Sequence, residues 1–94
     1  MSSTSGSGAA PKVENLKRLV EYQQQLVVSR MLVKNTGGSV TLFAFDGGEG
    51  LSEHTAPFDA LVIGVEGAAD IRLAGVVHRV GEGESLLMPA NVPH

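Results

Sequence analysis

The stretch that decides the fold is GESLLMPANVPH, residues 83–94. Residues 85–88 are a short apolar run of the kind found in buried strands, and Pro89 ends it because proline has no backbone N–H to donate. Pro93 fixes a second φ angle, so the loop is stiff where it reaches His94. A stiff loop that ends on an imidazole is suited to hold a ligand, because binding then requires little further ordering.

Working backwards from this stretch, the chain reads as further short strands separated by turns. Apolar runs on either side of Asn35-Thr-Gly-Gly38 predict a hairpin. Residues 69–73 alternate apolar and charged side chains, the period-2 pattern of a strand with one buried face. Such short strands with frequent turns predict an all-β antiparallel sandwich or barrel. The expected strands are residues 26–33, 39–45, 60–66, 69–73, 76–80 and 85–88.

The N-terminal region is expected to contribute little to the core. Residues 1–11 contain Ser, Gly, Thr and Ala but no large apolar residue after the first position, so they are predicted to be a disordered tail before a domain at 12–94. Apolar residues then recur at helical spacing, and Asn15 is a candidate N-cap. We expect one or two helical turns through about Glu21.

Composition excludes several classes of protein. A chain of 94 residues with 43% hydrophobic and 18% charged residues is one small folded domain. Its longest apolar run, residues 60–65, is too short for a membrane helix. The scattered basic and aromatic residues form no stripe that could follow a nucleic acid backbone. The absence of cysteine and of a basic, apolar leader favours a cytoplasmic protein without disulfides or thiolate metal sites.

Charge is distributed unevenly along the chain. Residues 1–45 hold five basic and two acidic side chains, whereas residues 46–94 hold two basic and eight acidic ones. The two halves therefore carry net charges of opposite sign, although the whole chain carries only −3.

Two motifs in the chain resemble those of the cupin superfamily. Gly48, five residues, His54 and a later Gly67 that closes an apolar strand are similar to the first cupin motif, G-x5-H-x-H-x3,4-E-x6-G. Residues 83–94 are similar to the second motif, G-x5-P-x-G-x2-H-x3-N, from its first glycine to its histidine.

The second motif contains one substitution, because Asn91 stands where the family has a glycine. Asparagine also adopts the left-handed backbone conformation that glycine allows. The resemblance covers about residues 39–94. It implies an antiparallel double-stranded β-helix, the jelly-roll or cupin barrel, preceded here by the short N-terminal helix.

The resemblance also implies a metal site inside the barrel. Of the four ligands that the family motifs supply, only His54 and His94 carry over, because the second histidine falls on Ala56 and the glutamate on Ala60. Two imidazoles suit a divalent first-row transition metal such as Mn, Fe, Ni or Zn. His78 has no counterpart in the motifs and is expected to be a packed or surface histidine.

Two functions are compatible with these residues. One is a metal-dependent cupin that binds a small molecule in the barrel and performs oxygenase-type or isomerase-type chemistry. The other is a metal-free cupin, either structural or binding a small molecule in an apolar cavity that Ala56 and Ala60 enlarge. The sequence does not choose between an enzyme and a binding protein.

The second cupin motif would continue three residues beyond His94 to an asparagine, and a jelly roll normally adds at least one more strand there. We therefore expect C-terminal strands to be missing and a sheet edge to be exposed. Exposed edges favour pairing between chains, so we expect a homodimer, with the strand at 26–33 a candidate for exchange. The alternative is that the natural protein continues beyond residue 94.

Overall fold

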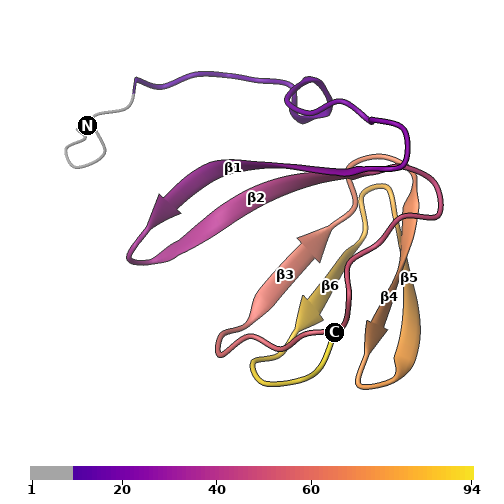
Figure 1. Ribbon diagram of the computed structural model, residues 1–94. Coiled ribbons are helices and arrows are strands. Elements are labelled where there is room, and N and C mark those ends of the chain that lie inside the picture. The colour runs from indigo at the N-terminus through magenta and orange to yellow at the C-terminus, as the bar shows by residue number, and fades with distance from the viewer. Residues whose placement is uncertain (1–9) are drawn as a thin grey trace.

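Strands dominate the structure, a computed structural model that describes residues 10–94. Almost no helix is present in this range, as the all-β prediction requires (Figure 1). Most of the predicted tail, residues 1–9, lies outside the described residues. The elements are η1 (Leu16–Arg18), β1 (Val27–Asn35), β2 (Gly38–Phe45), β3 (Ala60–Ile63), β4 (Ala68–Leu73), β5 (Val76–Gly81) and β6 (Ser85–Met88).

The strands pair as three two-stranded antiparallel sheets, β1–β2, β3–β6 and β4–β5. β1–β2 and β4–β5 are hairpins of consecutive strands. In the sequence, the β4–β5 hairpin lies between β3 and β6, which pair with each other. The six strands are those expected from the sequence, within a few residues at each end. Within residues 10–94 the three sheets are not joined into one continuous ladder, so the expected closed double-stranded β-helix is not observed as such.

Two tight turns set the hairpin registers. Asn35 accepts a hydrogen bond on Oδ1 from the N–H of Gly37 at 2.8 Å, which stabilises the β1–β2 turn. Ala74 and Gly75 have φ angles of 51° and 82°, the left-handed pair that a two-residue hairpin of type I′ requires. β1 is also bulged between Met31 and Val33.

Each of the three sheets contributes one buried residue to the core. Register places Met88 opposite Ala60 and Leu86 opposite Val62 on one face of β3–β6. On β4–β5, the buried Val80 shares its face with Ile71 and His78, which is half-buried there as a packed histidine. Only three described apolar residues are buried, so the core is thin; they are Ala44, Val80 and Met88.

A close crossing of backbones joins β3 to the β5–β6 turn. The N–H of Gly64 donates to the carbonyl of Glu84 at 2.8 Å, and the carbonyl of Gly64 accepts from the N–H of Gly83 at 2.8 Å. A Cβ atom at position 64 would collide with the carbonyl oxygen of Gly81. Glycine is required at position 64 because the two backbones approach so closely.

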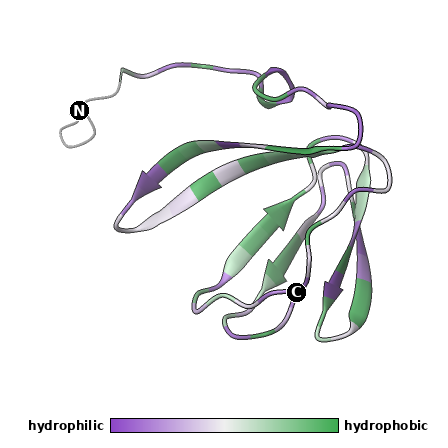
Figure 2. Cartoon of the chain, in the orientation of Figure 1, coloured by the Kyte–Doolittle hydropathy of each residue, from purple (hydrophilic) through white to green (hydrophobic). Residues whose placement is uncertain are grey.

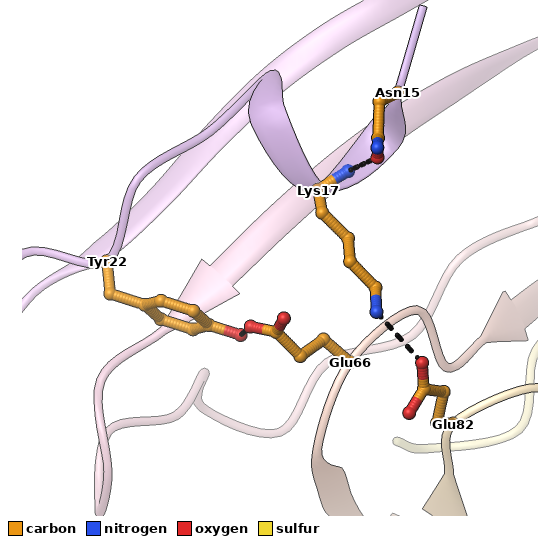
Figure 3. Close-up of polar contacts among 5 residues, drawn as sticks. All are labelled: Asn15, Lys17, Tyr22, Glu66 and Glu82. Carbon is orange, nitrogen blue, oxygen red and sulfur yellow. Dashed lines mark hydrogen bonds and ion pairs between the residues drawn. The ribbon is translucent and has the colours of Figure 1, made fainter.

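The N-terminal segment, residues 12–25, is attached to the sheets by side-chain contacts (Figure 3). Lys17 Nζ lies 3.0 Å from Glu82 Oε1, and the Tyr22 hydroxyl donates to Glu66 Oε2 at 2.9 Å. Asn15 accepts from the N–H of Lys17 at 3.0 Å and caps η1 as expected. The predicted helix is shorter than expected, a single 3-10 turn, because a short helix without a buried face gains too little from packing to extend.

We expect Gly64→Ala to lower the free energy of unfolding by roughly 1–3 kcal/mol or more, the usual cost of forcing an atom into filled space. Urea denaturation followed by circular dichroism measures the change. Gly47→Ala is the matched control, because a Cβ there meets no atom within 4 Å. Equal losses in the two variants would contradict the close crossing.

The structure also predicts how Tyr22 titrates. Its hydrogen bond to Glu66 raises the pKa of the phenol above its ordinary value of 10.0, and partial burial and the negative charge of Glu66 act in the same direction. Because the protonated phenol is favoured, the stabilisation from this bond is present below pH 10 and is lost as pH rises through the raised pKa.

Absorbance titration isolates this group, since the chain has one tyrosine and no tryptophan. The midpoint is expected above pH 10.0 in the wild type and closer to 10.0 in Glu66→Ala. Asp70→Ala is the control, because Asp70 pairs with Arg79 instead. An unchanged midpoint in Glu66→Ala would show that the segment is not held at this point.

Candidate functional site

The two histidines singled out in the sequence are brought together by direct backbone pairing. The N–H of His54 donates to the carbonyl of His94 at 2.7 Å, and the N–H of His94 donates back to the carbonyl of His54 at 2.9 Å. Such a reciprocal pair is the unit of an antiparallel ladder. A third bond, from the N–H of Asn91 to the carbonyl of Ala56 at 2.7 Å, continues the contact. The two motif segments therefore lie side by side.

The imidazole rings of this pair are adjacent, and each contacts a backbone carbonyl two residues earlier in the chain. Their centroids are 4.4 Å apart and their planes are inclined at 73°. Nδ1 of His54 lies 2.9 Å from the carbonyl oxygen of Ser52, and Nδ1 of His94 lies 3.2 Å from that of Val92. Because a carbonyl oxygen only accepts, each Nδ1 carries the proton, which leaves the lone pair on Nε2 free.

The loop that carries His94 is held from both sides. Asp59, at the entry to β3, accepts a hydrogen bond on Oδ1 from the N–H of Ala90 at 2.9 Å. The N–H of Ala74, in the β4–β5 turn, donates to the carbonyl of Pro93 at 2.9 Å. Asp59 thus supports the loop. The sequence alone does not predict this role, because it depends on the contact with the N–H of Ala90, which is distant in the chain.

Asn91 adopts the conformation expected from its place in the motif. Its φ angle is 64°, in the left-handed region where glycine is otherwise preferred. Because its N–H bonds to Ala56, this conformation directs the chain back along the first motif segment. The expectation that asparagine replaces the motif glycine at a left-handed position is confirmed.

No further ligand joins the two histidines in the described part of the chain. Residues 10–94 contain no group of three or more His, Cys, Asp or Glu side chains placed to hold a metal ion. Ala56 and Ala60, at the two positions where the family has ligands, are half-buried. Within the described residues, the histidine pair is therefore not part of a larger cluster of such side chains.

Two surface depressions lie away from the histidine pair. Two shallow grooves of about 440 and 390 Å³ run between the N-terminal segment and β1. Arg30 lines both, and its guanidinium donates to the carbonyl of Leu19 at 3.2 Å. Neither groove is lined by His54 or His94, so the grooves are separate from the candidate site.

Two solved structures show what the chain is similar to. A conserved protein of unknown function from Streptococcus pyogenes is 34% identical and superposes with a TM-score of 0.82, covering 90% of this chain and 75% of that one. A cupin 2 conserved barrel domain protein from Leptotrichia buccalis is 40% identical, with a TM-score of 0.82 over 85% of this chain. The chain belongs to the cupin superfamily.

This cupin spans 38% of the length of the Leptotrichia protein. No protein-family model matches it, and no curated protein does. No helix within residues 10–94 is long and apolar enough to cross a membrane.

The left-handed position of this cupin gives a test of the loop. Asn91→Val should lower the free energy of unfolding by about 1–2 kcal/mol, because a β-branched side chain is disfavoured at positive φ. Asn91→Gly, the family residue, is the matched variant and should leave stability within about 0.5 kcal/mol of the wild type. Thermal unfolding measures both, and equal losses would show that the side chain rather than the backbone conformation matters.

Proposed function

We propose that this cupin binds a divalent first-row transition metal through Nε2 of His54 and Nε2 of His94, with a small molecule beside it. The observation that carries the proposal is the anchoring of both Nδ1 atoms on backbone carbonyls. Histidines that ligate metals usually donate their other ring N–H in this way, which fixes the tautomer and the ring orientation.

Two neutral imidazoles are suitable ligands for Mn, Fe, Ni or Zn. Neutral imidazole is the commonest protein ligand for these ions, and a centroid separation of 4.4 Å allows two rings to approach one ion from different directions. With two protein ligands, several coordination positions stay open to water or a small molecule. When bound, the metal would polarise a small molecule, as isomerase-type chemistry needs, or activate dioxygen, as oxygenase-type chemistry needs.

The chain's own residues would orient the rings. The carbonyls of Ser52 and Val92 hold the ring planes, and the stiff loop at 89–94 holds the position of His94. We infer that the three sheets are walls of a jelly-roll barrel around this site. One face of β3–β6 is apolar, with Val62 and Leu86 half-buried next to the buried Met88.

A second candidate function is a metal-free cupin that binds a small molecule or serves as a structural barrel. The small number of candidate metal ligands favours this function, since Ala56 and Ala60 stand where the family motif has ligands. Each missing ligand weakens the affinity for the metal and loosens its geometry. Small apolar side chains at these positions also make room for an apolar ligand.

Metal content separates the two functions. Untagged protein is loaded in turn with Mn²⁺, Zn²⁺ and Ni²⁺, dialysed, and measured by elemental mass spectrometry. We expect close to one ion per chain for at least one metal in the wild type. His54→Ala and His94→Ala should each lose it, because a single imidazole cannot retain an ion through dialysis.

His78→Ala is the matched control, since His78 is half-buried on β5 and belongs to no His pair. It should retain the metal. Absence of metal from the wild type after each loading would overturn the metal-binding proposal and leave the metal-free function.

A further inference from the structure

The N-terminal segment, residues 12–25, is bonded to the β1–β2 hairpin on one side. The guanidinium of Arg30, on β1, donates to the carbonyl of Leu19 at 3.2 Å. The N–H of Gln25 donates to Oδ2 of Asp46, directly after β2, at 2.8 Å. The segment is therefore fixed to the hairpin at two points.

On its other side the same segment is bonded to the part of the fold formed by residues 60–94, here called the body (Figure 3). Lys17 Nζ lies 3.0 Å from Oε1 of Glu82 in the β5–β6 turn. The Tyr22 hydroxyl donates to Oε2 of Glu66, in the β3–β4 turn, at 2.9 Å. The segment thus has two tethers to the body as well.

These contacts are the polar connection between the hairpin and the body. Within residues 10–94, no hydrogen bond or ion pair joins residues 26–46 directly to residues 60–94. The three two-stranded sheets also share no ladder in this range. The segment therefore bridges two parts of the fold that are otherwise linked in the chain by the connection at 47–59.

The segment is held at these points rather than by a continuous packed face. Figure 2 shows polar residues along much of its length, and no residue of η1 is buried. Two shallow grooves of about 440 and 390 Å³ lie between the segment and β1, and Arg30 lines both. A segment attached in this way can open locally without exposing a core.

Charge favours the position of the segment on the two turns. Residues 64–67 and 81–84 contain three glutamates and no lysine or arginine, whereas the segment contains three basic and two acidic side chains. The Lys17–Glu82 pair is exposed, with 46% of one side chain and 60% of the other accessible. Salt screens exposed pairs of this kind, so this tether weakens as the ionic strength rises.

We propose that the N-terminal segment is a salt-sensitive strap that fixes the position of the β1–β2 hairpin relative to the body, and that its release makes the hairpin mobile. The Lys17–Glu82 pair is the tether that responds to salt. The Tyr22–Glu66 hydrogen bond has an uncharged donor and persists at higher ionic strength. The backbone pair of His54 and His94 lies outside the segment and stays intact on release.

The absence of cysteine from the chain allows the position of the hairpin to be measured directly. Lys34→Cys on β1 and Val77→Cys on β5, both at exposed positions, are labelled together with nitroxide spin labels. Pulsed electron paramagnetic resonance then gives the distribution of distances between the hairpin and the body. An excess of unlabelled protein restricts the measurement to distances within one chain.

Removal of both body tethers in Lys17→Ala/Tyr22→Phe should roughly double the width of this distribution, because the hairpin then loses its polar connection to the body. Asp70→Ala is the matched control. It removes an exposed ion pair of similar length, 3.3 Å to Arg79, that lies within β4–β5 and bridges nothing. Its distribution should keep the wild-type width, and circular dichroism confirms that each variant is folded.

The two single variants test the response to salt. Tyr22→Phe retains only the ion pair on the body side, whereas Lys17→Ala retains only the hydroxyl bond. Raising NaCl from about 0.1 M to about 1 M shortens the Debye length from about 10 Å to about 3 Å. The distribution should widen with salt in Tyr22→Phe and stay constant in Lys17→Ala.

Three results would overturn the proposal. An unchanged width in Lys17→Ala/Tyr22→Phe would show that the hairpin is fixed without the strap. Equal widening in Asp70→Ala would show that the loss of any surface ion pair has this effect. The same salt response in Tyr22→Phe and Lys17→Ala would show that the Lys17–Glu82 pair is not the salt-sensitive tether.

Discussion

The reciprocal hydrogen-bond pair between His54 and His94 is the constraint on which the rest of this cupin depends. It joins the long connection after β2 to the loop after β6, and so fixes the end of the molecule where the motif residues meet. Both donors and both acceptors belong to the backbone, so the pairing is independent of side-chain identity. The imidazoles are adjacent because the ladder places their Cα atoms opposite each other.

Other polar contacts hold the segments next to this pair. Asp59 and the β4–β5 turn hold the loop at 89–94 from two sides, and the left-handed Asn91 lets the loop reverse within the available length. At the opposite end of β3, Gly64 pairs with the β5–β6 turn. The short β3–β6 sheet is therefore fixed at both ends by backbone bonds, which compensates for a core with few buried side chains.

Hydrogen bonds are unevenly distributed over the structure. The histidine pair lies where hydrogen bonds are dense, as a ligand site requires. Within residues 10–94 the β1–β2 hairpin forms a sheet of its own, and Met31, Val33 and Val40 on it are exposed. The tethers of the N-terminal segment, Lys17 to Glu82 and Tyr22 to Glu66, are exposed contacts that contribute little stability but set where the segment lies.

The sequence by itself determined the strands, the turns and the two motifs. Period-2 alternation at residues 69–73 and the turn residues at 35–38 specify local backbone conformation, so the strand and the turn can be predicted without the tertiary structure. The left-handed backbone at Asn91 was predicted for the same reason, since it follows from the residue and its position in the motif. The helix length was overestimated, because packing rather than local periodicity decides whether a short helix extends.

Only the tertiary structure decided the rest. The protonation of Nδ1 in both histidines depends on carbonyls whose positions the loop geometry sets, and the support from Asp59 depends on an N–H far along the chain. Which side chains share a face of β3–β6 or β4–β5 also depends on which strands pair, because the pairing register determines it. A sequence specifies local conformation directly, whereas contacts between distant segments exist only once the chain has folded.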